Sequence, residues 1–156
     1  MAVTHDFDCE PSRIYELLTD PQFLVDRCLE MGELSAECEV FEEDGQTTIE
    51  LAREVQRDLP KVLAKMFDPV QMMDMTERWE EDGDGYSGNW TMLVRKQPVT
   101  ISATFTLVPT GAGCRYSVTH SAKAKIPLVG KQVEKFILGQ TADGARDELN
   151  YLAQQV

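Results

Sequence analysis

The feature that most constrains this chain is a strand-rich stretch that runs directly into one long amphipathic helix at the C-terminus. The junction between the two is the segment Lys125–Gly130, KIPLVG. A twisted sheet needs a cover over its concave face, and a helix entered straight from the last strand can lie in that hollow. Such a shell often leaves a ligand cavity. We therefore expect a curved sheet that grips the final helix.

Length and cysteine content limit the protein class. The 156 residues suit a single domain over residues 1–156, large enough to bury about two-thirds of its unfolded surface. The first residues show no basic cluster followed by an apolar core, and no apolar run approaches the roughly 20 residues that cross a bilayer. We expect a cytoplasmic protein without stable membrane insertion.

The four cysteines have no short paired spacing, which favours reduced, mostly buried thiols over a disulfide framework or a zinc site.

The formal net charge of -12 excludes one class of partner. Nucleic-acid affinity comes largely from clustered Lys and Arg that release counterions from phosphates, so we expect no nucleic-acid partner. An acidic surface of this kind serves solubility or, alternatively, a basic protein partner. We expect no cofactor and no metal, and a monomer or weak homodimer.

The hydrophobic period changes in an ordered way along the chain. Alternation predicts a first strand that ends at Asp8, Pro11 opens a short helix, and Asp20 caps a second helix that begins at Pro21 and stops at Gly32. From residue 34 onward, apolar residues again occupy every second position, which is typical of strands. Six further strands are expected over residues 34–40, 47–55, 71–80, 86–95, 99–108 and 115–126, followed by a helix over residues 128–155.

The order of elements resembles a known superfamily, and three motifs resemble one family within it. They are Leu59-Pro60 after the third strand, Glu77-Arg78-Trp79 in the fourth, and KIPLVG with Glu134 at the final helix. With the element order β-α-α-β6-α, the chain resembles the helix-grip (SRPBCC) superfamily of START lipid-transfer domains, birch-pollen allergens, polyketide aromatase/cyclases and coenzyme-Q-binding proteins. Within it, the chain is most similar to a bacterial family of uncharacterised proteins.

The resemblance implies both a fold and a ligand class. The implied fold is α+β, a curved antiparallel sheet of about seven strands wrapped around a long C-terminal helix. The implied ligand is an apolar or amphipathic small molecule, such as a lipid, sterol, quinone or polyketide, held between sheet and helix.

Strand alternation indicates which side chains would line such a cavity. The inferred wall is apolar with a few polar groups, and the small residues of the last strand leave room. The candidate ligand-binding residues are Leu51, Arg53, Met66, Phe67, Met73, Met75, Glu77, Trp90, Met92, Phe105, Tyr116, Val118, His120, Ala122, Val133, Phe136, Ile137 and Gln140.

Three residues interrupt the apolar rows: Arg53, Glu77 and His120. A buried charge is costly unless it is paired. Either Arg53 and Glu77 form an ion pair at the sheet rim while His120 is a hydrogen-bonded core histidine, or the three contact a ligand. His120, with Tyr116 beside it on the same strand face, is the candidate general acid or base if the protein catalyses a reaction.

Two further segments bear on the cavity. Leu59, Val62, Leu63, Met66 and Phe67 have helical spacing, which predicts a short helix, capped by Asp58, that is either a fixed part of the core or a lid. Methionines cluster around position 73, which favours either an adaptable ligand wall or ordinary core filling. Gly139 and Gly144 weaken the last helix and suggest a bend or a close approach of a ligand or neighbouring strand, although helix packing alone would also explain them.

Two functions from different classes follow as hypotheses. The first is a carrier or sensor that binds an apolar or amphipathic molecule without turnover. The alternative is a cyclase- or dehydratase-like enzyme that uses His120 with Tyr116 or Glu77 on a polyketide-like substrate. A third possibility, a protein-interaction module, would require a contiguous apolar patch on the outer surface.

Overall fold

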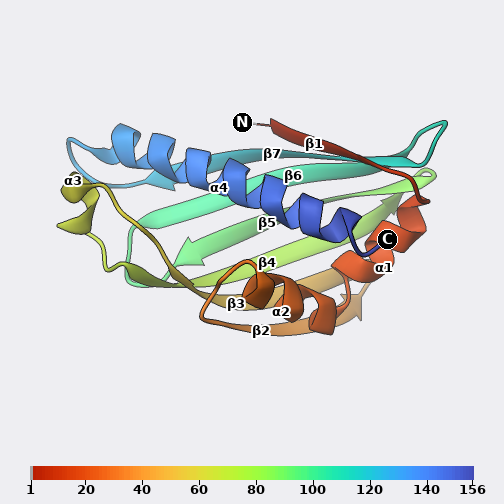
Figure 1. The fold of residues 1–156 in the computed structure, drawn as a ribbon, viewed down its shortest axis with the longest axis horizontal. Coiled ribbons are helices and arrows are strands. Elements are labelled where there is room, and N and C mark those ends of the chain that lie inside the picture. The colour runs from red at the N-terminus through yellow and green to blue at the C-terminus, as the bar shows by residue number, and fades with distance from the viewer. Residues whose placement is uncertain (1) are drawn as a thin grey trace.

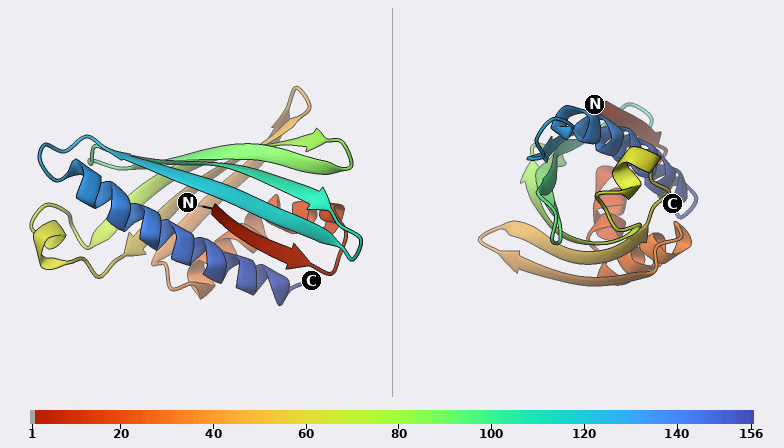
Figure 2. Two further views of the ribbon diagram at one scale, coloured as in Figure 1. Left: turned by 90° about the horizontal axis from the view of Figure 1, so that it is seen from above. Right: turned by 90° about the vertical axis from the view of Figure 1, so that its left-hand side faces the viewer.

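A computed structural model describes residues 2–156, and Figure 1 shows their arrangement. A 7-stranded antiparallel sheet in the order β1-β7-β6-β5-β4-β3-β2 curls around the long C-terminal helix α4 (Figures 1 and 2). The predicted α+β fold and the succession of one strand, two helices, six strands and a long helix are confirmed. The strands are β1 (Ala2–Phe7), β2 (Ser35–Glu43), β3 (Gln46–Gln56), β4 (Val70–Asp82), β5 (Gly85–Val94), β6 (Val99–Pro109) and β7 (Cys114–Ala124).

The two N-terminal helices begin where their sequence signals place them. Helix α1 (Pro11–Leu18) and helix α2 (Pro21–Glu30) each have proline at the first position, where its missing N–H is not needed. The carboxylate of Asp20 accepts a hydrogen bond of 3.0 Å from the backbone N–H of Gln22, so the predicted cap is confirmed. Gly32 follows the end of α2 with a φ of 90°, a conformation that favours glycine.

Antiparallel register aligns the inner faces of neighbouring strands into rows across the sheet. One row runs from Ile49 through Glu77, Trp90 and Ala103 to His120. The next row includes Leu51, Met75 and Met92. These rows face α4, so the apolar residues of every second position form the core and position the polar residues among them.

Helix α4 (Gly130–Ala153) covers only part of the concave face. It packs against β7 and β1, while α2 packs against β2 at the opposite edge of the sheet. Figure 2 shows α4 along one side of the curled sheet. The middle strands β3, β4 and β5 therefore lie under the gap between the two helices, and this gap positions the site.

The strand-to-helix junction is fixed by contacts of its motif residues. The chain turns at Leu128, which has a φ of 70°, and α4 begins two residues later. A carboxylate oxygen of Glu134 accepts a hydrogen bond of 2.9 Å from the backbone N–H of Ala124 at the end of β7. This contact ties the N-terminal part of α4 to the sheet and accounts for an acidic residue at this position.

The segment after β3 differs from the expected helix. A short helix is present as predicted, but only Lys61–Ala64 (α3) is helical, and because it begins after Pro60 the predicted Asp58 cap is wrong. The residue before a proline is biased away from helical geometry, which keeps Leu59 outside. Leu63 and Phe67 are buried, whereas Val62 and Met66 are 44% and 39% exposed. Of the apolar residues in this segment, Leu63 and Phe67 therefore pack into the core, whereas Val62 and Met66 face outward.

None of the helices in residues 2–156 combines the length and apolar character that a membrane-spanning helix needs. All four cysteines are free thiols, and Cys28 and Cys114 are buried. Burial raises the pKa of the Cys28 thiol to about 12.

Candidate functional site

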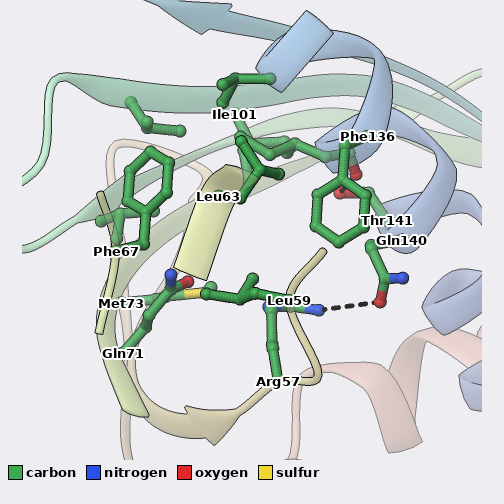
Figure 3. A pocket seen from close by; sticks show the side chains of 14 residues that line it. Arg57, Leu59, Leu63, Phe67, Gln71, Met73, Ile101, Phe136, Gln140 and Thr141 are labelled. Atoms are coloured by element: carbon green, nitrogen blue, oxygen red, sulfur yellow. Dashed lines mark hydrogen bonds between the residues drawn. The ribbon is translucent and has the colours of Figure 1, made fainter. Parts of the chain in front are cut away.

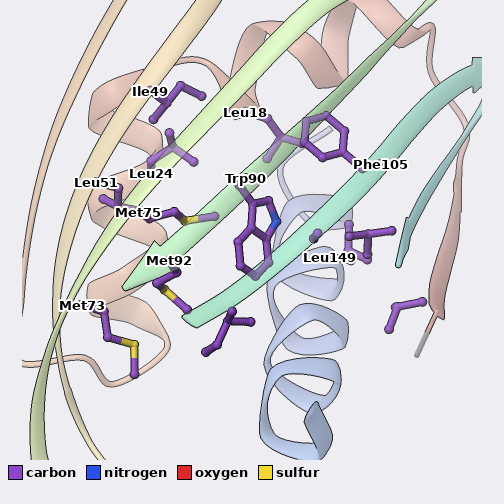
Figure 4. Packing of buried hydrophobic residues seen from close by; sticks show 14 of the residues in the cluster. Leu18, Leu24, Ile49, Leu51, Met73, Met75, Trp90, Met92, Phe105 and Leu149 are labelled. Carbon is purple, nitrogen blue, oxygen red and sulfur yellow. The ribbon is translucent and has the colours of Figure 1, made fainter. Parts of the chain in front are cut away.

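A cavity of about 340 Å³ lies in the gap between α4, α2 and the middle of the sheet. Its apolar wall comes from the inner faces of β4, β5 and β7, where Met73, Met75, Trp90, Met92 and Val118 are all buried. In Figure 4, Met75, Met92 and Trp90 extend from their strands toward α4. This volume and lining are typical of a site for a small organic molecule.

The mouth of the cavity is marked by its exposed lining residues. Gly32 lies after α2, Gln56 ends β3, and Asp143 and Asp147 lie on α4. The cavity therefore opens between α4 and the ends of α2 and β3. Gly144 lies beside this opening, and a Cβ atom at this position would meet no other atom within 4 Å. The missing side chain therefore enlarges the space under the helix. No neighbouring strand comes close enough to exclude a larger residue at this position.

A network of buried ion pairs lies beside the apolar wall. Arg27 of α2 and Glu148 of α4 are 2.8 Å apart, between Nη2 and Oε2. The other oxygen of Glu148 is 3.9 Å from Nη2 of Arg53 on β3. Arg53 also donates two hydrogen bonds to Glu33, one of them 2.9 Å long from Nε to Oε1. Two arginines and two glutamates thus neutralise each other and join α2, β3 and α4.

Electrostatics keep this network ionised. Burial alone would raise the pKa of Glu148, but Arg27 and Arg53 outweigh it, so the pKa lies below its ordinary value. Burial would likewise lower the pKa of Arg53, and Glu148 and Glu33 reverse that effect and raise it. The side chains of Arg27, Arg53 and Glu148 are 12%, 13% and 19% exposed, so water screens them only weakly.

Glu77 is a further carboxylate on the cavity wall and lies outside this network. It is partly buried on β4, directly opposite Trp90 on β5. Its Oε2 accepts a hydrogen bond of 2.8 Å from the indole N–H of Trp79. Burial raises the pKa of Glu77 to about 7, because the hydrogen bond from Trp79 and the charge of Arg27 offset only part of the desolvation.

Tyr116 and His120 project from β7 into the same cavity. They are 8% and 4% exposed. Burial, reinforced by the charge of Glu77, raises the pKa of Tyr116 well above its ordinary value. The rings of His120 and Trp90 lie 5.6 Å apart, between centroids. The candidate acid–base residues therefore face the space under α4.

The expected ion pair between Arg53 and Glu77 is wrong. Arg53 pairs with Glu33 and Glu148, and Glu77 instead bonds to Trp79. The cause lies in the register, because Glu77 is opposite Ile49, two rows away from Arg53. Sequence reasoning missed Arg27, Glu33 and Glu148.

A second, much smaller cavity of about 30 Å³ lies toward the first half of α4 (Figure 3). A hydrogen bond of 3.4 Å from Nη1 of Arg57 to Oε1 of Gln140 crosses between the two cavities, and both residues line both. Phe67, Val133, Phe136 and Ile137 line this smaller cavity, and Met73 lines both. A wider, open depression of about 650 Å³ lies among polar turns at residues 8–12, 83–86 and 109–113.

Most of the predicted lining residues lie at one of the two cavities beneath α4. Arg53, Met73, Met75, Glu77, Trp90, Met92, Tyr116, Val118, His120 and Gln140 line the larger one. Four predicted residues line neither. Leu51 and Phe105 are buried in the packed core, Ala122 is half-buried, and Met66 lies on the surface.

The sequence profile of a family described as "Protein of unknown function (DUF2505)" matches residues 2–156. No curated protein matches the sequence. Solved structures are similar over nearly the whole chain. A START superfamily protein from Mycobacterium smegmatis is 13% identical, with a TM-score of 0.65 and coverage of 99% of this chain and 97% of that one.

Two other bacterial structures give the same result. Protein CV1439 from Chromobacterium violaceum is 20% identical, with a TM-score of 0.56 and coverage of 100% of this chain and 95% of that one. A putative uncharacterized protein from Rhizobium leguminosarum is 10% identical, with a TM-score of 0.61 and coverage of 99% and 91%. These similarities confirm the START-like helix-grip fold.

Proposed function

This chain belongs to the DUF2505 family, and we propose that it binds an apolar or amphipathic small molecule beneath α4, as a carrier or sensor. The observation that supports the proposal is the cavity of about 340 Å³ with its wall of Met73, Met75, Met92 and Trp90. Flexible thioether side chains adapt to apolar ligands of varied shape. The START-like fold is compatible with such a role.

Two glycines of α4 provide a matched test of where the ligand binds. A Cβ at Gly139 or at Gly144 would meet no atom within 4 Å, but only Gly144 lines the large cavity. Leucine is a good helix former, so neither substitution should harm the helix. We expect Gly144→Leu to fill the space and weaken binding at least about ten-fold, because the ligand must then displace a packed side chain.

The measurement is displacement of a fluorescent apolar dye by fatty acids, sterols and quinones, combined with native mass spectrometry after gentle purification. The Gly139→Leu variant should bind as the wild type does. Equal binding by both variants would place the ligand elsewhere. Absence of bound material and of dye displacement in the wild type would contradict the proposed function itself.

A second candidate function is supported by the grouping of His120, Tyr116 and Glu77 on one cavity wall. Groups of this kind beside an apolar space can act as general acid and general base, as a cyclase- or dehydratase-like reaction on a polyketide-like substrate requires. This enzyme would exchange solvent deuterium into the α-carbon of a bound β-diketone, detectable by NMR. A His120→Asn variant should lose the exchange while retaining dye binding, and a wild-type rate equal to buffer alone would exclude the reaction.

A further inference from the structure

The charges that line the large cavity do not balance. Three arginines and five acidic residues, besides His120, contribute to the lining. Arg27 and Arg53 are matched by Glu148 and Glu33 within the ion-pair network. Asp143 on the rim pairs with Arg146, at 3.2 Å. The lining charges that remain are Arg57 against Glu77 and Asp147, so the cavity carries one excess negative charge when all its carboxylates are ionised.

Glu77 contributes to this excess negative charge from the cavity wall. Among residues 2–156 no arginine or lysine lies within ion-pair distance of it, although it faces the cavity rather than bulk water. A desolvated carboxylate that arginines reach only at longer range is unfavourable in its ionised form, so that form gains from a cation that enters the cavity and contacts it. Its hydrogen bond to Trp79 occupies Oε2 and fixes the side chain.

The groups around Glu77 favour a positively charged head. Trp90 lies directly opposite Glu77 across the β4–β5 pair, and such neighbours have Cβ atoms roughly 5 Å apart. Tyr116 and Trp90 both line the cavity, and aromatic faces attract organic cations. The net charge of -12 also raises the local concentration of cations over anions.

From this arrangement we infer that the ligand is an amphipathic organic amine, whose ammonium group pairs with Glu77 between the rings of Trp90 and Tyr116. Its apolar tail then lies along Met73, Met75 and Met92. The inference rests on the proposed binding function and adds the chemical class of the ligand. A carboxylate head would gain a hydrogen bond from Nε of Arg27, which has no acceptor in the described part of the chain, but it would face the excess of acidic groups.

The experiment compares three probes with the same tail, decylamine, decanol and decanoate, below their aggregation concentrations at about pH 8. Calorimetric titration of the wild type should give the amine an advantage of about ten-fold over the alcohol, with the carboxylate weakest. In Glu77→Gln the amine and the alcohol should bind within about two-fold of each other. The control Glu50→Gln removes one charge from the outer face of β3 and should keep the wild-type preference.

The possible outcomes separate this inference from the function on which it rests. Equal binding of all three probes, or preference for the alcohol or the carboxylate, would overturn the amine assignment and leave the cavity a general apolar site. A preference for the amine that survives in Glu77→Gln would also overturn it, because net charge alone would then be the cause. Failure of all three probes while fatty acids, sterols or quinones still displace the dye would overturn the amine assignment alone. Failure of every one of these ligands would contradict the proposed function.

Discussion

Replacing Glu148 by alanine is expected to lower the free energy of unfolding by about 3 kcal/mol, because it leaves two buried arginines short of their shared carboxylate. Arg27 loses its partner at 2.8 Å and has no second ion pair among residues 2–156. Arg53 keeps Glu33. Urea unfolding at neutral pH, analysed by linear extrapolation, measures the change.

The reason for this loss is the unpaired charge, and a double replacement separates it from the loss of contacts. In Arg27→Met with Glu148→Leu the charges disappear together and apolar side chains of similar size remain, so most of the stability should return. The exposed pair Arg115 and Asp6 provides a comparison, since Asp6→Ala should cost far less. A double variant as unstable as Glu148→Ala would show that the network contributes mainly through packing and geometry.

Much of the fold was predictable because local signals agree with the tertiary structure. Alternating apolar residues marked the strands, and Asp20 followed by Pro21 located the start of α2. The extent of the one-turn helix α3 was overestimated from the apolar spacing between Leu59 and Phe67. This spacing contains no information about the constraint that Pro60 places on the residue before it. Periodicity predicts which face is apolar more reliably than how far a helix extends.

The ion-pair network was not predictable in the same way, because its residues come from α2, β3, α4 and the segment between α2 and β2. A signal was nevertheless present. Glu148 follows Ala145 by three residues and precedes Leu152 by four, so it occupies an inward position of an apolar helical stripe. Arg27 lies in the same way between Leu24 and Met31. A charged residue at such a position predicts a buried partner, but only the fold identifies which one.

Replacing Glu77 by glutamine is expected to stabilise the protein above about pH 7 by about 3 kcal/mol. The carboxyl has a pKa of about 7 in the folded protein against 4.5 as its ordinary value. Between these values the folded state holds a proton that the unfolded state has released. The free energy of unfolding of the wild type therefore falls as the pH rises from about 4.5 to about 7, and the deficit is complete above it.

Comparing the wild type with Glu77→Gln isolates the ionisation of Glu77 because the other titratable groups near it are present in both proteins. Arg27 of α2, Arg53 of β3 and Glu148 of α4 act on its carboxyl, and Cys38 of β2 and Tyr116 of β7 are acted on by it. His120 lies in the same row of the sheet. The difference between wild-type and Glu77→Gln urea curves, from about pH 4 to about pH 8, cancels the contributions that these groups share.

The glutamine side chain keeps an oxygen that can accept the hydrogen bond from Trp79, so the substitution removes the charge with little change in packing. The difference in stability should be near zero below about pH 4 and increase to its full value near pH 8. The Glu50→Gln control on the outer face should show no such increase. A flat difference for Glu77→Gln would mean that its carboxyl is not desolvated in the folded protein. A gain in stability accompanied by loss of amine binding would show that this carboxylate is retained for its ligand at a cost to the fold.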